Sequence, residues 1–420
     1  MGKEHPKSAF EAALVTRRYV HFDIPLSRAD CKKLVTDPAA VESHSFYPFM
    51  RHDIVRAKLK RTSTGIKKSC KVRDIRYASH ADAAIYAYYN FLLMERYEKH
   101  LLDIGLSDNV IAFRALSKSN VDFAQEAFEW IDGNRPCLAL GFDVKDFFGS
   151  LDHRLLKKCW ASLLELDALP DDHYSVFKSL AKHASVELIA ARKALGLSRE
   201  SLGRISRLCS PAEFRKTIRG GNLVFVNSQS CGIPQGSPVS AALSNIYMLP
   251  FDAKLKAAVE GMGGLYRRYF DDILVVVPEM DAASICQLVQ SELSSLKLSM
   301  QPSKTLVCHF GPGKSDVPLQ YLGLIYDGTQ VVLRASGVAR FYLKMRRGVG
   351  QFKDAKKTDG DTALLVQRRR TLLQRYTEHT STEARSYFKY VKMAARKSKS
   401  AAIRRQLNGH RRRLKLLIER

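Results

Sequence analysis

Short apolar runs bounded by polar turns predict the strands of this chain. CLALGFDV (137–144) is apolar up to a terminal acidic residue, which is typical of a buried strand. GLYRRYFDDILVVV (264–277) has two β-forming arms with two acids between them. We expect one small hairpin over 319–335 and another in NLVFVNS (222–228). KVRDIRYA (71–78) alternates charged and β-forming residues, as an exposed strand or hairpin arm does.

Apolar residues at helical spacing predict helices over 82–102, 153–200, 239–259 and 282–298. After residue 338 the pattern is helical and basic to the end, with one break at LNGHRRR. A chain of 420 residues with 45% hydrophobic residues can bury a core shared by two or three subdomains.

Charge changes this picture at the C-terminal end. The chain has 68 Lys and Arg against 42 Asp and Glu, a net charge of +26, which favours a polyanionic partner. Residues 341–420 contain 23 basic and 6 acidic residues, so they carry +17 of that charge. Nucleic acid is the first candidate partner and an anionic membrane surface the second. A basic protein without such a partner is the third interpretation.

The cysteines and the N-terminus argue against several protein classes. The eight cysteines form no CxxC pair, so we expect no zinc knuckle, and their scatter is typical of reduced thiols in a cytosolic protein. The start, MGKEHPKSAF, has no apolar core of a signal peptide. No apolar run reaches the roughly 18 residues of a membrane span. We therefore expect a cytoplasmic protein with no membrane partner.

Three acids end predicted strands. Asp271 and Asp272 lie between two apolar arms, where a turn suits adjacent acids better than a strand interior does. Asp143 ends the run at 137–144. Each of these acids taken alone is equally compatible with a solvated turn or a cap. Side by side, however, the two strands would bring Asp143 within reach of Asp271.

Converging carboxylates raise one another's pKa unless a cation lies among them. Two Mg²⁺ ions suit this site because they prefer carboxylate and phosphate oxygens, and such a pair supports in-line phosphoryl transfer. GIPQGSP (232–238) adds a loop ahead of a helix whose first residues are small. Its glycines allow a nucleotide backbone to approach closely, although a plain Gly/Pro loop is the alternative.

In this order the segments resemble the fingers and palm motifs of reverse transcriptases, over about residues 60–335. FDVKDFF resembles motif A, SCGIPQGSPVS motif B, and YFDD the Tyr-x-Asp-Asp of motif C. QPSKT resembles motif D, QYLGLIY the primer-grip hairpin, and KVR the fingers strand that holds the triphosphate. The resemblance implies an α+β right-hand polymerase fold with fingers, a palm of antiparallel sheet plus helices, and an α-helical basic thumb.

The resemblance also implies domain limits. The expected parts are an N-terminal extension (1–60), the fingers and palm (61–335), and a basic thumb that binds RNA (336–420). Within the second part, the fingers elements extend over about 61–135 and the palm over about 136–335, with an insertion at 151–231.

The family's motifs assign metal-binding roles by position. Asp143 and Asp271 would bridge two Mg²⁺ ions, for which Mn²⁺ can substitute. Asp272 would complete the catalytic cluster, and the Val144 carbonyl would add a ligand.

The same motifs assign the nucleotide-binding residues. Lys71 and Arg73 would hold the triphosphate, and Gln235 would line the pocket. Phe148 would be a steric gate that excludes a ribose 2′-hydroxyl, or else a core phenylalanine. Lys304 would protonate the leaving pyrophosphate, or else be a solvated lysine.

The implied function is that of an RNA-directed DNA polymerase, a nucleotidyltransferase that copies an RNA template into cDNA from deoxynucleoside triphosphates. RNA-copying RNA polymerases of this fold usually carry Asp at the gate position and Gly-Asp-Asp in motif C, and this chain differs at both places. FFGSLDH and GIPQGSPVSAALSNIYM resemble the corresponding segments of bacterial enzymes, including retron and group II intron reverse transcriptases. YVHFDIPLS, SFYPFMR and YASHADAAIYAYY most resemble the second class of antiphage defence-associated reverse transcriptases.

That class binds and copies a structured non-coding RNA in antiphage defence. A retron-type reverse transcriptase, a template-independent DNA polymerase and a non-catalytic palm-fold scaffold that binds RNA are the alternatives.

The basic tail combines leucines with arginine runs, in DTALLVQRRRTLLQRY (361–376) and LNGHRRRLKLLIER (407–420). Leucines can face a core while the arginines stay outside and bind nucleic-acid phosphates. A solvated basic face and a membrane-surface helix are the alternatives. The candidate phosphate-binding residues are Arg368, Arg369, Arg370, Arg411, Arg412 and Arg413.

Overall fold

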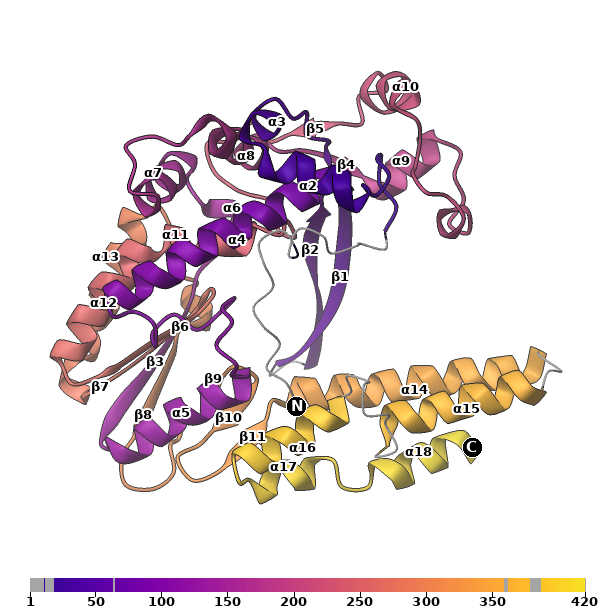
Figure 1. Ribbon diagram of the computed structural model, residues 1–420. Helices are drawn as coiled ribbons and strands as arrows, with labels where there is room; N and C mark the ends of the chain where they lie inside the picture. Colours follow the sequence, from indigo (N-terminus) through magenta and orange to yellow (C-terminus); the bar gives the residue numbers. More distant parts are fainter. Residues whose placement is uncertain (1–10, 12–18, 63–64, 359–361, 378–386, 420) are drawn as a thin grey trace.

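A computed structural model describes residues 11, 19–62, 65–358, 362–377 and 387–419. Figure 1 shows three parts: helices at the top with a long hairpin descending from them, a sheet at lower left, and C-terminal helices at lower right. Antiparallel sheets and many helices confirm the expected α+β class. In the described part of the chain, no helix combines the length and apolar composition that crossing a membrane requires.

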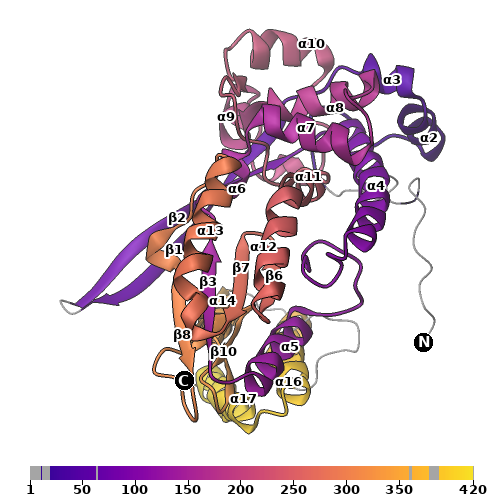
Figure 2. The same ribbon diagram turned by 90° about the vertical axis from the view of Figure 1, so that its left-hand side faces the viewer.

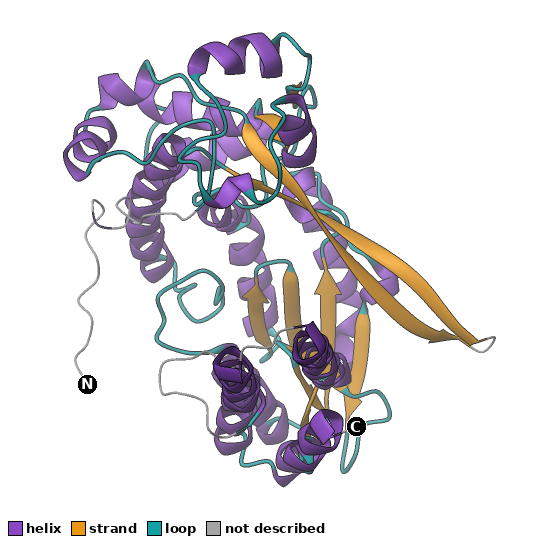
Figure 3. Cartoon of the chain, turned by 90° about the vertical axis from the view of Figure 1, so that its right-hand side faces the viewer, coloured by secondary structure: helices purple, strands orange, loops and turns teal. Residues whose placement is uncertain are grey.

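The hairpin consists of β1 (Phe49–Thr62) and β2 (Gly65–Tyr77), paired from Met50 opposite Tyr77 to Thr62 opposite Gly65. Figure 3 shows it projecting as a two-stranded arm. The strand expected at 71–78 is its second arm. The first arm begins inside the expected N-terminal extension, so the boundary at residue 60 falls within a strand. The sequence of β1 mixes charged and apolar residues without the regular alternation that marks a half-buried strand, which explains why β1 was not predicted.

The root of the hairpin is buried among short elements. Phe49 and Met50 are buried, and β1 pairs there in parallel with β4 (Ala184–Glu187). The long helix α4 (His80–Asp103) is capped by Ser79, whose hydroxyl accepts the Asp82 N–H at 3.2 Å. The other helices of this part are α2 (Arg28–Thr36), α3 (Pro38–Glu42), α6 (Phe147–Ser150), α7 (His153–Leu163), α8 (Asp171–Ala181), α9 (Leu188–Ala194) and α10 (Pro211–Glu213).

The central sheet has the order β6-β7-β3-β8, and all its neighbours are antiparallel. Its strands are β3 (Cys137–Asp143), β6 (Leu265–Tyr269), β7 (Asp272–Val277) and β8 (Leu306–Phe310). The two central strands, β3 and β7, are buried on both faces, so they are almost continuously apolar rather than alternating. Leu140 and Val275 pack in one core, and their neighbours Ala139 and Leu274 pack in the other.

Helices α11 (Ser240–Tyr247), α12 (Leu249–Gly261) and α13 (Ala282–Ser295) contribute to the first of these cores. The second includes α5 (Asn120–Gly133) and the small sheet of β9 (Leu319–Tyr321), β10 (Leu324–Tyr326) and β11 (Val331–Leu333). It continues into the C-terminal helices. Figure 2 shows α5 beside α16 at the bottom of the molecule, where Lys397 pairs with Asp122 at 2.5 Å.

Three expected elements differ in detail. The helix expected over 239–259 is two helices that meet at Met248, because Pro250 lacks the N–H that a continuous helix would need there. The hairpin expected in 222–228 is instead one short strand, β5 (Phe225–Val226), which pairs with β4. The 319–335 segment forms three strands rather than two, and a strand, β4, interrupts the helices of 153–200.

The C-terminal helices are α14 (Ala335–Thr358), α15 (Thr362–Tyr376), α16 (Tyr387–Lys397), α17 (Ala401–Gln406) and α18 (His410–Glu419). The expected break precedes α18 at Gly409, whose φ of +81° suits glycine. Leu372 is buried as expected, whereas its neighbour Leu373 is 38% exposed.

A buried ion pair joins α12 to β6. Arg268 and Asp252 both have fully buried side chains and form a bidentate pair, with nitrogen–oxygen distances of 2.6 Å. The Tyr266 hydroxyl donates to the same carboxylate at 2.5 Å. Arg268 also donates to the side-chain oxygen of Asn245 at 3.1 Å. Every charge in this network therefore has partners, as burial requires.

Asp252→Asn should lower the free energy of unfolding by about 3–5 kcal/mol, because it leaves the Arg268 guanidinium buried without a counter-charge. Urea unfolding measures the change. Lys254→Gln is the matched control on the same helix: it removes the pair of Glu292 with the 61% exposed Lys254 and should cost about 1 kcal/mol or less. Equal losses in the two variants would contradict the assigned role of the pair.

Candidate active site

The pairing of β3 with β7 brings the predicted acids together. Asp143 is directly opposite Asp272, and the Val144 N–H donates to the Asp271 carbonyl at 3.3 Å. The Asp143 carbonyl accepts the N–H of Gln301 at 2.8 Å, which ties the end of β3 to the chain before β8. The three candidate metal-binding carboxylates thus lie at one end of the central sheet.

The turn between β6 and β7 is held by a hydrogen bond to its backbone and by aromatic packing around Phe270. Phe270 has a φ of +63°, a conformation that only supporting contacts maintain in a bulky residue. The buried Arg268 donates to its carbonyl at 3.1 Å. Three rings surround the Phe270 ring, with centroid distances of 5.2 Å to Phe113, 5.1 Å to Phe147 and 4.9 Å to Phe148. These contacts fix the direction of Asp271.

Electrostatic strain is concentrated at the turn. Partial burial, followed by the charges of Asp272 and Asp143, raises the pKa of Asp271 to about 6. Partial desolvation, followed by the charge of Asp143, also raises the pKa of Asp272. The Lys304 ammonium contacts Asp143 and opposes both shifts. Lys304, predicted to act on pyrophosphate, therefore forms an ion pair with a candidate metal ligand.

The donor set fits hard cations. Carboxylates are preferred ligands of Mg²⁺. Burial first, and neighbouring carboxylates second, raise the pKa of Asp271 and Asp272, and a bound cation would stabilise their ionised forms. Among the described residues, no three His, Cys, Asp or Glu side chains are close enough to form a ready-made cage. Lys304 supplies the positive charge at Asp143 in this arrangement.

The loop at 231–238 is anchored from several directions. Its Gly232 N–H donates to the Leu151 carbonyl at 2.9 Å, and the Ile233 N–H donates to the Phe148 carbonyl at 3.0 Å. The Ser240 hydroxyl donates to Pro234 at 2.7 Å.

Gly236 of this loop has a φ of +123°, and a Cβ there would lie 2.4 Å from the Arg76 carbonyl oxygen. Only glycine allows this approach of the loop to β2.

The approach brings Arg76 to the loop. Its N–H donates to the Gln235 carbonyl at 2.9 Å, and its guanidinium pairs with Asp74 at 2.7 Å and contacts the His183 ring. Burial, followed by the charge of Arg76, lowers the pKa of His183 to about 4. His183 is thus neutral at pH 7 and can accept from the guanidinium, while its other ring nitrogen donates to Leu180 at 2.9 Å.

The predicted nucleotide-binding residues fall into two groups, one beside the 231–238 loop and one on β2. Phe148 and Gln235 are partly buried on adjoining segments, α6 and the 231–238 loop. Arg73 is exposed on β2, three residues farther from the root than Arg76. Lys71 lies in the same strand, but its side chain is outside the described part of the structure.

Sequence reasoning did not identify Arg76 or the pair of Arg268 with Asp252. An arginine in the apolar arm before YFDD could have indicated a buried partner. The position of Arg76 depends on contacts between segments far apart in the sequence.

The six predicted phosphate-binding arginines are exposed on two helices, α15 and α18. The Arg413 guanidinium lies over the Tyr342 ring at 4.5 Å from its centroid. Arg369 and Arg411 border one groove between the two helices.

Residues 185–326 match the family described as "Reverse transcriptase (RNA-dependent DNA polymerase)". The matched third of the chain includes Asp271 and Asp272, whereas Asp143 lies outside it. None of the curated proteins compared matches the chain.

Solved structures with remote similarity include apo telomerase from Candida tropicalis, with 11% identity and a TM-score of 0.42, over 89% of this chain and 60% of that one. Telomerase from Candida albicans in complex with a fragment of telomeric RNA has 12% identity and a TM-score of 0.39, over 93% and 66%. An RNA-dependent RNA polymerase of a human picobirnavirus has 11% identity and a TM-score of 0.43, over 98% and 72%. This chain thus spans less than two thirds of the length of these telomerase chains.

His183→Gln should change how stability depends on pH. The pKa of His183 in the folded state, about 4, is below the usual 6.5, so the unfolded chain binds more protons between these values. Wild-type stability should therefore fall as the pH falls from about 6.5 to 4, by up to about 2–3 kcal/mol through this group. The variant should lose that component of the slope in urea unfolding followed across this range.

His309→Gln is the matched control, because His309 is 64% exposed. It should keep the wild-type slope. An unchanged slope in His183→Gln would show that His183 titrates normally.

Proposed function

We propose that this protein is a reverse transcriptase that copies a bound RNA into DNA at the carboxylates of Asp143, Asp271 and Asp272. The observation that carries the proposal is the register of β3 with β7, which sets Asp143 opposite Asp272 beside the Asp271 turn. Two of these acids lie in the segment that matches the reverse transcriptase family. The proposal extends that match to the whole chain and to its substrates.

The three carboxylates and the Val144 carbonyl would hold two Mg²⁺ ions, or Mn²⁺ in their place. When bound, the ions would lower the pKa of a primer 3′-hydroxyl and stabilise negative charge on the reacting phosphate. Asp271 would bind in its ionised form, which its raised pKa makes costly without a cation.

Lys304 would leave the Asp143 carboxylate and interact with the leaving pyrophosphate instead. Its ammonium contacts Asp143 in the structure, and a bound cation would compete for the same carboxylate. The released ammonium would then donate a proton to the leaving pyrophosphate oxygen. This assignment combines the motif resemblance with the proximity of Lys304 to the acids.

The substrate pocket would lie between the 231–238 loop and β2. Gln235 would line it, Phe148 would contact the sugar, and Arg73, with Lys71, would bind the triphosphate. The backbone N–H of Arg76 would join β2 to the loop at the base of this pocket. We propose deoxynucleoside triphosphates as the substrates because a ring at Phe148 would exclude a ribose 2′-hydroxyl.

We further propose that the template is a structured non-coding RNA and that the enzyme acts in the cytoplasm in antiphage defence. The N-terminal phrases that resemble the defence-associated enzymes support this role. The exposed arginines of α15 and α18 would bind phosphates of this RNA. Recognition of one RNA would then depend on its folded shape and unpaired bases.

The central experiment is primer extension by the purified protein on an RNA template with Mg²⁺. Wild type should incorporate deoxynucleotides complementary to the template, whereas Asp271→Asn should lose synthesis by about a hundredfold or more, because the variant lacks a metal-binding carboxylate. Asp316→Asn, an exposed carboxylate outside the site, is the matched control and should remain active. Incorporation that ignores the template, or an active Asp271→Asn variant, would contradict the proposal.

Sugar selection tests the pocket separately. Phe148→Ala should increase ribonucleotide incorporation relative to deoxynucleotide incorporation on one template, because the ring that meets the 2′-hydroxyl is removed. Phe113→Ala removes another ring from the Phe270 cluster and should leave the ratio unchanged. A ratio unaltered in Phe148→Ala would assign Phe148 to packing, with a stability loss of about 3–5 kcal/mol instead.

A further inference from the structure

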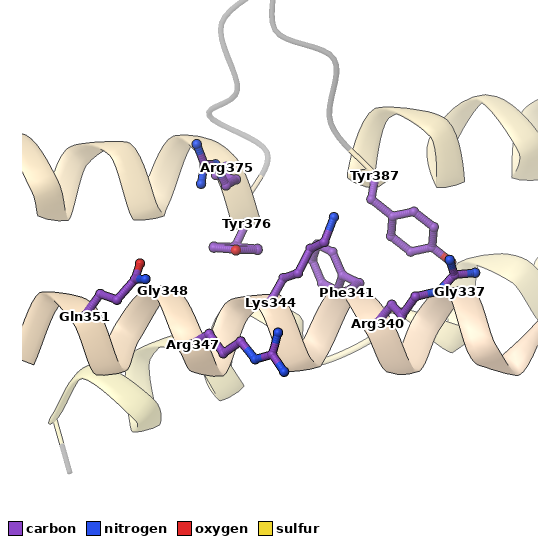
Figure 4. Close-up of a pocket in the computed structure, with 10 residues that line it drawn as sticks. All are labelled: Gly337, Arg340, Phe341, Lys344, Arg347, Gly348, Gln351, Arg375, Tyr376 and Tyr387. Atoms are coloured by element: carbon purple, nitrogen blue, oxygen red, sulfur yellow. The ribbon is translucent and has the colours of Figure 1, made fainter. Parts of the chain in front are cut away.

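The C-terminal helices line a cavity of about 630 Å³ that is open to solvent and that the proposed polymerase site does not use (Figure 4). Its volume is within the range of small-molecule binding sites. The lining residues belong to α14, α15 and the start of α16. None belongs to β3, β7 or the 231–238 loop, so the cavity is distinct from the carboxylate site.

Four cations line this cavity: Arg340, Lys344 and Arg347 from α14, and Arg375 from α15. The three on α14 are three or four residues apart, so they share one face of the helix, where like charges repel. Within the described residues no carboxylate pairs with any of the four, and none lines the cavity. A bound anion would relieve this repulsion.

The cavity also has an aromatic wall. The Phe341 ring lies between Tyr376, at 5.6 Å, and Tyr387, at 5.4 Å between centroids. Figure 4 shows Lys344 extending past these rings. Burial raises the pKa of Tyr387 to about 12, so its hydroxyl is protonated at neutral pH and can donate a hydrogen bond. An inorganic anion would leave this wall unused.

Two glycines of α14 keep the walls close. A Cβ at Gly337 would lie 2.9 Å from the Tyr387 hydroxyl, and one at Gly348 would lie 3.0 Å from a methyl carbon of Leu372. Side chains at these positions would push α16 and α15 away from α14. The glycines therefore allow rings and cations from three helices to face one space.

We propose that this cavity binds one nucleoside phosphate, with the base against the aromatic wall and the phosphate among the four cations. Bases stack on aromatic rings irrespective of sequence, and arginine pairs with phosphate through its planar fork. The nucleotide has two possible sources, an unpaired residue of a bound RNA strand or a free nucleotide. In either case the cavity is a second nucleotide site, away from the polymerase carboxylates.

The test measures binding in the presence of EDTA, which removes metal-dependent binding at the polymerase site. The probes are a labelled single-stranded RNA hexamer and the same hexamer with all bases removed. Wild type should bind the base-bearing hexamer at least about fivefold more tightly than the abasic one. Tyr387→Leu should reduce this ratio to near one.

Lys344→Gln tests the phosphate contact without changing the packing, because Lys344 is exposed. It should weaken both hexamers alike and flatten the log–log salt dependence by about 0.7. Arg346→Gln is the matched control: it removes one exposed charge of α14 outside the cavity and should retain the wild-type ratio.

Competition by AMP distinguishes the two sources. Displacement of the hexamer by AMP at comparable concentrations would identify a site for free nucleotides, whereas displacement by oligomers alone would identify a site for strand residues. Equal wild-type affinity for the two hexamers would overturn the proposal. A ratio that persists in Tyr387→Leu would also overturn it. Because no synthesis is measured, failure of the polymerase proposal would leave this result unaffected.

Discussion

The geometry of the candidate active site depends on one buried ion pair. Arg268 and Asp252 have no solvent access, and burying such charges is costly unless every donor and acceptor is satisfied. Here the guanidinium satisfies the carboxylate on one side and holds the Phe270 carbonyl on the other. The second contact supports a turn whose φ is unfavourable for phenylalanine. A charge network within the core thereby determines where Asp271 points, and the aromatic rings around Phe270 keep the turn from relaxing. We infer that this pair contributes more to positioning than to net stability, since apolar replacements often match buried pairs in stability.

Strand register provides the second constraint. A shift of one residue between β3 and β7 would turn every side chain of the shifted strand to the opposite face. Both faces of this sheet are packed, with Leu140 and Val275 in one core and Ala139 and Leu274 in the other, so such a shift would misplace the side chains of both cores. The same packing that stabilises the sheet therefore keeps Asp143 opposite Asp272. The loop that carries Gln235 is positioned independently, through backbone hydrogen bonds to Phe148, Leu151 and β2.

Local patterns predicted much of this arrangement, and tertiary contacts account for the rest. The acids Asp143, Asp271 and Asp272 were identified because each ends or begins an apolar strand, a signal contained within a few residues. The first hairpin arm was missed because charged and apolar residues are mixed along it without regular alternation. The helix over 239–259 was predicted as continuous because its apolar spacing outweighed Pro250. The sequence predicted Lys71 and Arg73 as the triphosphate-binding residues and did not indicate Arg76, since only the folded chain brings Arg76 to Gly236. The aromatic wall was also unpredictable, because Phe341, Tyr376 and Tyr387 come from three helices.

The carboxylate site and the cavity of the C-terminal helices concentrate charge of opposite sign. At the carboxylates, folding buries neighbouring acids and raises the pKa of Asp271, and the ammonium of Lys304, which contacts Asp143, opposes this shift. In the cavity, folding gathers four cations against aromatic rings. Neither arrangement stabilises the chain by itself, because like charges repel in both. Natural proteins keep such strain mainly where a ligand relieves it, and here the two ligands implied are metal cations and nucleotide phosphates. The proposed polymerase function requires both, which would give the uneven charge of this sequence a single physical explanation: acids on the sheet would bind the metal, and the basic C-terminal helices would bind the polyanion.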